Sequence, residues 1–274
     1  MTPPPWTPED APEPLRLGPG GWARVIARGL PLGLVVYAGL LLLLALRLLE
    51  RPLCGQARPV TPFVTQGVCK AAFAILGMGH RVRGSPMRGV GAIVANHASW
   101  LDIFALNAPQ RIYFVAKAEV ARWVGIGWLA RATGTVFIAR KGAEALSQTR
   151  LFESRLRAGH RLLFFPEGTS TDGLRVLPFK TTLFAAFFAD GLAGVTRIQP
   201  VSLLYRPPEG AEARFYGWWG TMEFGPHLLK TLGARRQGSV EVIFHAPLAV
   251  ADFPDRKTLA AACERAVRAP FAEL

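Results

Sequence analysis

Residues 94–102 read VANHASWLD, and this stretch decides how the rest of the chain is interpreted. The run GAIVA at 91–95, made of small and β-branched residues, predicts a buried strand that stops at Asn96. His97 and Asp102 follow within one short loop. A structural interpretation makes Ser99 the cap of a helix and Asp102 its third residue, as in a capping box. A chemical interpretation makes His97 a general base and Asp102 the acid that orients it.

Apolar, β-rich runs alternate with helix-like stretches beyond residue 80. The expected strands are 91–96, 111–116, 134–139, 161–166, 197–205 and 239–248. Helical patterns occupy 141–158 and 179–191, and an amphipathic helix is expected to close the chain at 255–269. Strands that alternate with helices are typical of α/β proteins. The prediction is therefore an α/β domain over 81–274, with a mixed sheet flanked by helices.

The N-terminal part differs from this domain in composition. Residues 1–22 are rich in proline and predict a disordered tail. Residues 30–46 carry no charge, and at about 1.5 Å per residue they reach roughly 25 Å, the lower limit for crossing a bilayer. Residues 63–79 predict an amphipathic helix. We expect 23–80 to form membrane-associated helices, with 30–46 either spanning the bilayer or re-entrant. A cleavable signal peptide is disfavoured, because LRLLER follows instead of a small-residue cleavage site.

The charge of the chain indicates what kind of partner it has. The formal net charge is +13, from 32 Lys and Arg against 19 Asp and Glu, and 50% of the residues are hydrophobic. A chain this basic and this apolar favours an anionic membrane surface as its partner. Nucleic-acid binding is not expected, because no zinc-finger, basic-zipper or RNP-like pattern is present. The cysteines and histidines are dispersed without CxxC or HExxH spacing, so we expect no disulfide scaffold, no metal site and no cofactor.

Four short stretches at strand ends or in loops together resemble the glycerolipid acyltransferases typified by 1-acylglycerol-3-phosphate acyltransferases. The matching residues, in chain order, are Asn96, His97 and Asp102 of NHxxxxD; Gly134, Phe137, Ile138 and Arg140; Phe165, Pro166, Glu167, Gly168 and Thr169 of FPEGT; and Pro200. One such block is weak evidence, whereas four in order over about residues 80–205 are a specific match.

The resemblance implies that His97 takes the proton from an acceptor hydroxyl, while Asp102 holds the imidazole and stabilises its cation. The substrate's own alcohol is then the nucleophile, and the sequence contains no GxSxG elbow that would supply another. Backbone amides near Gly168 and Thr169 are candidates for the donors that a thioester oxyanion needs. The acyl donor would be acyl-ACP or acyl-CoA, and the acceptor a lyso-lipid. The substrate-binding residues implied by the resemblance are Asn96, Gly134, Phe137, Arg140, Glu167, Gly168, Thr169 and Lys180.

One position departs from the phosphatidate-forming members, which read FPEGTRS. Ser170 stands where those members have an arginine, whose planar guanidinium suits a phosphate. The stretches NHASWLDI, FPEGTSTDG and LPFKTTLF instead resemble a bacterial subgroup that acylates lyso-ornithine lipid, an acceptor without a phosphate. We therefore expect lyso-ornithine lipid as the acceptor. The alternative is lysophosphatidic acid, with Arg175 in place of the missing arginine.

Two other classes of function remain as alternatives. A lipid hydrolase needs an enzyme nucleophile, and Ser99 is the nearest candidate to His97. A non-catalytic membrane-binding protein needs neither residue. Neither class accounts for four ordered blocks. Because the acyl donors are cytosolic, we expect a bacterial inner-membrane enzyme whose site faces the cytoplasm.

Overall fold

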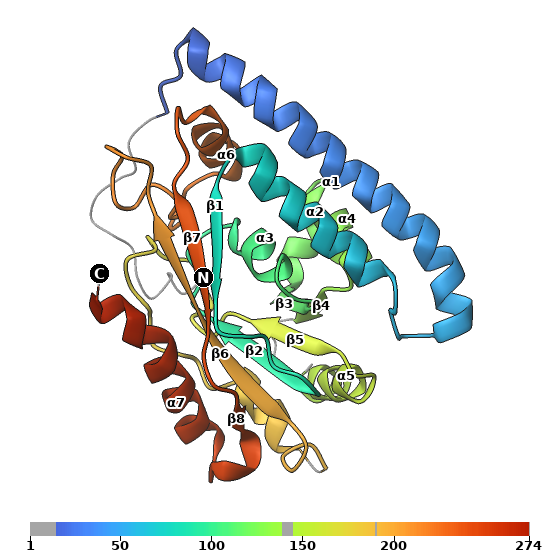
Figure 1. Cartoon of the computed structure of the whole chain (residues 1–274). Coiled ribbons are helices and arrows are strands. Elements are labelled where there is room, and N and C mark those ends of the chain that lie inside the picture. Colours follow the sequence, from blue (N-terminus) through green and yellow to red (C-terminus); the bar gives the residue numbers. More distant parts are fainter. Residues whose placement is uncertain (1–14, 139–144, 190, 274) are drawn as a thin grey trace.

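A mixed β-sheet forms the centre of the structure (Figure 1). The computed structural model describes residues 15–138, 145–189 and 191–273. Within them the sheet has eight strands, in the order β1-β7-β6-β2-β5-β3-β4, with β8 paired to β6. The strands are β1 (Gly79–Arg83), β2 (Gly91–Ala95), β3 (Tyr113–Lys117), β4 (Val136–Ile138), β5 (Arg161–Phe164), β6 (Arg197–Arg206), β7 (Ser239–Phe244) and β8 (Leu248–Ala249).

The strands from β6 to β4 in this order run parallel to one another. β2 is parallel to both β5 and β6, and β3 is parallel to both β5 and β4. β7 runs antiparallel to β6 and parallel to β1, which makes the sheet mixed. The carboxyl ends of five strands therefore meet at one edge of the sheet, the place where α/β folds gather their functional loops.

The central strand β2 is buried along its whole length, as the run GAIVA predicts. Its side chains alternate between two hydrophobic cores, one on each face of the sheet. Ala92 and Val94 join one core, and Ile93 and Ala95 join the other. The strand is thus held between two packed layers, and the loop that follows it starts from a fixed point.

Helices cover both faces of this sheet (Figure 1). The core that contains Ile93 is closed by α2, α3 and α6, and the core that contains Val94 is closed by α5, α7 and a 3-10 helix at Leu183–Phe188. The helices are α1 (Pro19–Cys54), α2 (Thr61–Leu76), α3 (Asp102–Asn107), α4 (Ile126–Thr133), α5 (Ala145–Arg157), α6 (Phe224–Gly233) and α7 (Arg256–Arg268). The prediction of an α/β fold with a mixed sheet flanked by helices is confirmed.

The N-terminal helices α1 and α2 form a hairpin on the outside of the domain (Figure 1). Glu50 closes it, because its buried carboxylate accepts hydrogen bonds from the amides of Val60 and Thr61 and from the Thr61 hydroxyl. α1 contains the uncharged run 30–46 and is, by length and composition, long and apolar enough to cross a membrane. The helix begins at Pro19, within the 1–22 segment expected to be a tail, and residues 1–14 lie outside the described part.

The structure corrects one predicted helix. Residues 179–191 contain a short 3-10 helix at Leu183–Phe188 instead of an α-helix. Phe184 and Phe187 are three residues apart, and a 3-10 turn places such side chains on the same side. Both are fully buried and contact Phe164 of β5, so packing against the sheet accounts for the tighter turn. The helix expected to start near Ser99 is present as α3, whereas sequence analysis missed β1, α4 and α6.

Candidate active site

The loop from Asn96 to Leu101 begins at the carboxyl edge of the sheet, directly after β2. Asn96 is completely buried, and its side chain acts as a brace between this loop and β6. Its Nδ2 donates to the Leu203 carbonyl at 3.0 Å, and its Oδ1 accepts from the Leu203 amide at 2.8 Å. Asn96 therefore fixes the start of the loop. The structure thus gives Asn96 a bracing role, and the substrate-binding role implied by the resemblance stays a prediction.

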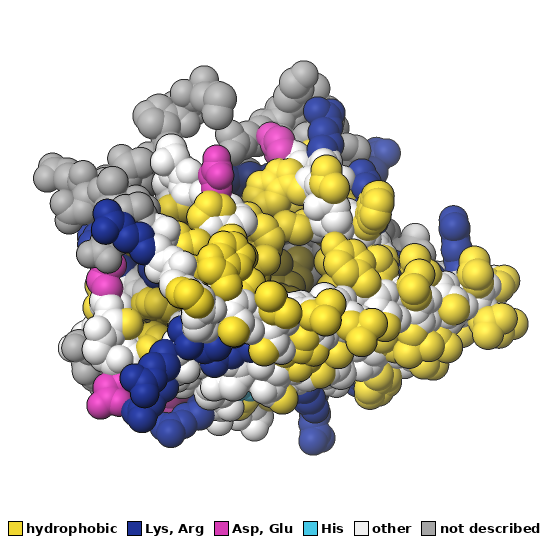
Figure 2. Space-filling model, turned by 90° about the horizontal axis from the view of Figure 1, so that it is seen from above, with side chains coloured by type: hydrophobic (Ala, Val, Ile, Leu, Met, Phe, Trp, Pro, Cys, Tyr) yellow, Lys and Arg dark blue, Asp and Glu magenta, His cyan; other side chains and the backbone are white. Residues whose placement is uncertain are grey.

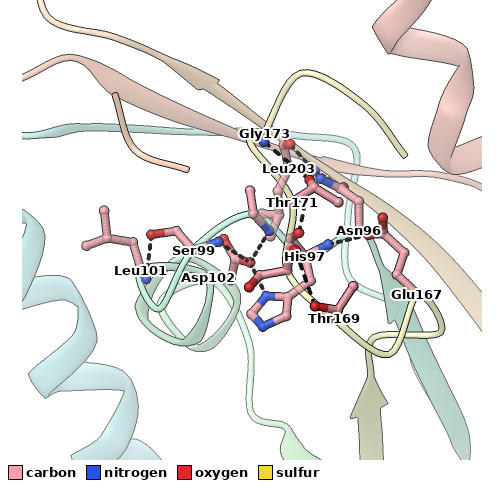
Figure 3. Close-up of polar contacts among 12 residues, drawn as sticks. Asn96, His97, Ser99, Leu101, Asp102, Glu167, Thr169, Thr171, Gly173 and Leu203 are labelled. Atoms are coloured by element: carbon pink, nitrogen blue, oxygen red, sulfur yellow. Dashed lines mark hydrogen bonds and ion pairs between the residues drawn. The ribbon is translucent and has the colours of Figure 1, made fainter. Parts of the chain in front are cut away.

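His97 and Asp102 meet across the loop (Figure 3). Five residues turn about 140° on a helix, so the pair needs a bend between them. The bend is there because α3 begins only at Asp102. His97 Nδ1 lies 2.6 Å from Asp102 Oδ2, and the carboxylate is completely buried. A carboxylate only accepts hydrogen bonds, so Nδ1 carries the proton and, in the neutral ring, Nε2 keeps its lone pair.

The Asp102 carboxylate is held by other donors as well. Its Oδ2 accepts from the amides of Ala98 and Ser99, and its Oδ1 accepts from the Tyr205 hydroxyl at 2.6 Å. Burial raises the pKa of Tyr205 well above its usual range, with the nearby Asp102 charge adding to the effect, so this hydroxyl stays a donor. Asp102 serves at once as the start of α3 and as the orienting acid for His97. The structural and chemical interpretations of VANHASWLD are therefore compatible.

Ser99 does not occupy the position of a nucleophile. Its side chain is completely buried, and its Oγ accepts a hydrogen bond from the Leu101 amide at the beginning of α3. This arrangement gives Ser99 a structural role at the beginning of α3. A buried hydroxyl in this position does not favour Ser99 as a hydrolase nucleophile.

The imidazole of His97 is the accessible member of the pair. Its side chain is 21% exposed, whereas that of Asp102 is 0% exposed. The ring stacks on Phe165, with 4.1 Å between centroids and an interplanar angle of 11°. Figure 3 shows the ring nitrogen opposite Nδ1 directed away from Asp102. The arrangement presents one basic nitrogen to an incoming group while the rest of the ring is fixed.

Glu167 supports the His97 loop through hydrogen bonds to the backbone. Its carboxylate is completely buried and accepts from the His97 amide at 2.6 Å and from the Leu177 amide at 2.7 Å. Burial raises the pKa of Glu167 to about 8, against the two amide hydrogen bonds, which favour the charged form. Both oxygens are taken up by the backbone, so the structure gives Glu167 a positioning role, and the contact with the acceptor stays a prediction.

Gly168, Thr169 and Lys180 lie together beside the His97 loop. A Cβ at Gly168 would lie 2.6 Å from Lys180 Nζ, so the lysine passes directly over this glycine. The Gly168 amide donates to the Phe165 carbonyl within a turn, which occupies one of the two amides expected to bind the oxyanion. The Lys180 side chain is exposed and Thr169 is partly exposed, so these two remain placed for contact with a substrate.

Gly134 is not brought to His97, whereas Phe137 lies at the carboxyl edge of the sheet, level with Ala95 but separated from β2 by β3 and β5. Gly134 ends α4 in a left-handed conformation, immediately before β4. Because β4 runs in the same direction as β2, a residue at its start lies at the amino edge of the sheet, opposite the His97 loop. The Gly134 carbonyl accepts a hydrogen bond from Arg155, and Phe137 lies within β4 itself. Arg140 lies outside the described residues.

Sequence reasoning missed two residues of the site. Tyr205 lies at the apolar end of β6, where only its hydroxyl sets it apart from a core residue. Thr171 follows FPEGTS, and its amide donates to the His97 carbonyl at 2.9 Å, which ties the two loops together. The sequence signal that could have identified these two residues is a side-chain hydroxyl within an otherwise apolar strand or just after a motif. Within the described part of the chain, no group of three or more His, Cys, Asp or Glu is placed to hold a metal ion.

Comparisons with known proteins agree with this geometry. Residues 81–203 match the sequence model of the acyltransferase family. The chain is 59% identical to the lyso-ornithine lipid O-acyltransferase of Rhodobacter capsulatus, over 98% of this chain and 97% of that relative. It is 41% identical to the protein of the same name from Brucella abortus, over 72% and 75% of the two chains. A 1-acyl-sn-glycerol-3-phosphate acyltransferase of Neisseria gonorrhoeae is 32% identical, over 74% and 79%.

A solved structure supports the fold independently. The crystal structure of the 1-acyl-sn-glycerophosphate acyltransferase of Thermotoga maritima superposes with a TM-score of 0.58, over 90% of this chain and 97% of that one. At 22% sequence identity this likeness concerns the fold alone. The family assignment comes instead from the matched domain and from the relative that is 59% identical over nearly the whole length. The chain therefore belongs to the acyltransferase family and is an acyl-transferring enzyme.

Proposed function

We propose that this enzyme transfers a fatty acyl group from acyl-ACP or acyl-CoA to the hydroxyl of lyso-ornithine lipid, with His97 as the general base. The observation that carries the chemistry is the 2.6 Å contact between His97 Nδ1 and the buried Asp102 carboxylate. This contact leaves the lone pair of Nε2 on the accessible side of the ring. A base of this kind needs no serine from the protein, because the alcohol to be acylated is itself the nucleophile.

The reaction then follows from the geometry. His97 Nε2 accepts the proton of the acceptor hydroxyl while its oxygen attacks the thioester carbonyl carbon. The tetrahedral intermediate collapses as the carbon–sulfur bond breaks, and the imidazolium returns its proton to the thiolate that leaves. Asp102 stabilises the imidazolium between these steps, and Glu167 and Thr171 keep the loop in position.

The surroundings of Ser170 support an acceptor without a phosphate. The nearest arginine in sequence is Arg175, whose guanidinium forks onto the Asp172 carboxylate with distances of 3.2 and 3.0 Å. Asp172 is 1% exposed, so this ion pair is anchored to the interior. A guanidinium that already binds a carboxylate bidentately is a poor substitute for a phosphate clamp. The relatives named for lyso-ornithine lipid are also more similar than the one from Neisseria gonorrhoeae.

The composition supports a membrane location. α1 supplies an apolar helix, and the net charge of +13 favours the anionic inner leaflet. Because the acyl donors are cytosolic, the site faces the cytoplasm at the bacterial inner membrane. The partners are thus a lyso-lipid in the leaflet and a soluble thioester.

The test is acyl transfer by membranes that carry the protein, with labelled acyl-ACP or acyl-CoA as donor. Lyso-ornithine lipid and lysophosphatidic acid are offered in separate reactions. We expect product from lyso-ornithine lipid, and a loss of roughly 10²–10⁴-fold in His97→Ala, the usual contribution of a general base. Ser99→Ala is the matched control within the same loop, and immunoblots verify equal amounts of protein.

Each other outcome has a definite meaning. Product from lysophosphatidic acid alone would overturn the acceptor while the mechanism stands. Full activity of His97→Ala would overturn the mechanism. Complete loss in Ser99→Ala, with an acyl group trapped on the wild-type protein and none on the variant, would favour a hydrolase.

A further inference from the structure

Two arginines meet at Gly134, at the amino edge of the sheet. Arg58, in the turn between α1 and α2, donates from Nη1 to the Ala132 carbonyl at 2.7 Å, and a Cβ at Gly134 would lie 2.9 Å from its Cζ. Arg155, on α5, donates from Nη2 to the Gly134 carbonyl at 2.5 Å. The two guanidinium groups thus approach the same residue from two elements that are far apart in the chain.

The ring of Tyr113, at the start of β3, lies close to both groups. Arg155 Cζ is 4.9 Å from the ring centroid, and Arg58 Cζ is 6.0 Å from it. Tyr113 is buried, and the ring of His160 packs on it with 4.2 Å between centroids. The two arginines and His160 therefore form one cluster around Tyr113, which we call the amino-edge cluster.

The two arginines of this cluster have no carboxylate partner. No Asp or Glu among the described residues forms an ion pair with Arg58 or Arg155. Glu50 acts on Arg58 from a distance, but its carboxylate already accepts hydrogen bonds from Thr61 and Arg47. The positive charge of the amino-edge cluster is therefore not balanced by the acids of this part of the chain.

Burial makes this arrangement costly. Figure 2 shows Lys and Arg side chains that project from the surface of the molecule, where water screens the charge. Arg58 and Arg155 are instead only partly exposed, and a charge away from water is unfavourable unless it is paired. Burial, and next the positive charge of neighbouring arginines, lowers the pKa of Arg58 and of Arg155. The surroundings of the cluster therefore favour a negative charge beside it.

The cluster also has donor groups that can hold an anion. The Nε atoms of Arg58 and Arg155 are buried and have no hydrogen-bond partner among the described residues. His160 is 4% exposed, and neither of its ring nitrogens has a hydrogen-bond partner in that part of the chain. Burial, Arg155 and Arg58 lower the pKa of His160 to about 4, against a weaker contribution from the Gln56 backbone, so the ring is neutral and offers one N–H.

A small cavity adjoins the cluster and limits the size of a ligand. It is lined by Arg58 and Tyr113 together with Thr61, Thr65 and Thr133, and its volume is about 10 Å³. A volume of this size has room for about one particle as large as a water molecule. A monatomic anion therefore fits the cavity, whereas a phosphate or a sulfate does not.

We propose that the amino-edge cluster binds one small monovalent anion of the class of chloride, held between Arg58 of the hairpin turn and Arg155 of α5. A water molecule could accept the same hydrogen bonds, but it carries no charge to offset the two cations. The bound anion joins the hairpin turn to α5 and to the start of β4, so it stabilises the fold from the edge opposite His97. The inference does not depend on the acceptor or on the acyl donor.

Thermal unfolding in different salts tests the site. The full chain, purified in detergent, is heated at constant ionic strength while chloride replaces gluconate stepwise. We expect the melting temperature to rise by roughly 2–4 °C and then to level off, because an anion that binds only the folded state stabilises it by mass action. Arg155→Gln should lose this rise, since it removes one guanidinium group. Arg157→Gln is the matched control and should keep it, because Arg157 is exposed on the same helix.

The two salts are compared within each protein, so a general loss of stability in Arg155→Gln does not affect the result. Arg58→Gln is the second variant if Arg155→Gln does not fold. A wild type without a chloride effect would overturn the proposal. An equal effect in Arg155→Gln or Arg58→Gln would also overturn it, since chloride would then act elsewhere on the protein. The same saturable rise with sulfate would refute the assignment to a monatomic anion.

Anomalous scattering from bromide locates the ion directly. Crystals of the full chain are soaked in bromide, which replaces chloride and scatters anomalously. We expect a peak within hydrogen-bond distance of the guanidinium groups of both Arg58 and Arg155, and no such peak in crystals of Arg155→Gln. Peaks on the surface alone, from an adventitious ion only, would overturn the proposal.

Discussion

At the scale of single residues, the blocks of the sequence motif divide into one reactive group and several supports. His97 is partly exposed, whereas Asn96, Asp102 and Glu167 are all buried and fix the loop around it. Each support satisfies backbone or side-chain donors that would otherwise be left without partners in the interior. The motif therefore specifies a loop conformation as much as a reaction, and a histidine without these three neighbours would not be held in place.

The pH dependence of stability tests the role of Glu167. Its pKa is raised to about 8 in the folded protein, from an ordinary value of 4.5. Between these two values the folded state holds a proton that the unfolded state has lost, so the contribution of this group to stability falls as pH rises from about 4.5 to 8. We expect the unfolding free energy of wild type to decline over this range, and Glu167→Gln to show a smaller decline. Denaturant unfolding in detergent at several pH values measures it.

Glu167→Gln also tests whether the two hydrogen bonds from backbone amides hold the loop. Both oxygens of Glu167 accept from amides, and in the protonated carboxyl the hydroxyl oxygen can still accept, whereas a glutamine side chain has only one oxygen. Glu167→Gln is therefore expected to be less stable at pH 5 by about 1–3 kcal/mol, the cost of an unpaired buried group. A variant with wild-type stability and an unchanged pH profile would contradict the positioning role.

At the scale of elements, the close approach of β2 and β6 depends on Gly91. Its φ is +154°, and a Cβ there would lie 1.9 Å from the Arg197 carbonyl oxygen. Gly91→Ala must therefore push the two strands apart at the start of the strand that carries His97. We expect a loss of several kcal/mol, at or above the usual range of about 1–3 kcal/mol for overpacking, and a parallel loss of acyl transfer.

Gly67 provides the matched control, because it is exposed in the middle of α2 and an added Cβ meets nothing within 4 Å. Gly67→Ala should stabilise the protein by up to about 1 kcal/mol, through helix propensity alone. Thermal unfolding of both variants in detergent compares them. Similar effects in the two would show that the contact between β2 and β6 is not under steric constraint.

Sequence patterns identified the apolar strands and the longer helices, and missed several short or exposed elements. The apolar runs behind β2, β5, β6 and β7 were found because a central strand reads as a continuous apolar stretch. β1 (GHRVR) was missed because it is an exposed edge strand with charged residues. The His97–Asp102 contact was predicted from the NHxxxxD resemblance. The contact between Tyr205 and Asp102 was not predicted, because only the strand order of the sheet places β6 beside this loop.

At the scale of the whole molecule, composition indicated a membrane partner but not how the N-terminal helix meets it. An uncharged run of this length fits a spanning helix as well as a surface helix. The structure adds contacts that hold the helical hairpin on the domain: α1 contacts the end of α6, and Arg58 in the hairpin turn contacts α4, and these contacts join residues up to 209 positions apart in the chain. No local pattern encodes such contacts, so the arrangement could be recognised only from the structure.

The attachment of α1 is open to a direct test through Arg28. Its Nη1 donates to the carbonyls of Leu232 and Ala234, at 2.9 and 2.6 Å, at the end of α6, where a cation is favoured by unpaired carbonyls. Arg28→Gln removes the charge from these hydrogen bonds and should release the first half of α1. We expect amide hydrogen exchange in residues 19–35 to become roughly tenfold faster or more, because charged hydrogen bonds contribute about 1.5–3 kcal/mol.

This result is interpreted by comparing the amide exchange rates of α1 with those of the sheet. Exchange in β2, β5 and β6 should stay at the wild-type rate, and Arg51→Gln, at the exposed far end of the same helix, should change neither region. If helix and sheet accelerated together, α1 would belong to the same cooperative unit as the catalytic domain. If neither changed, Arg28 would not hold the helix, and the hairpin would be attached through the contacts of Tyr37 and Arg58 instead.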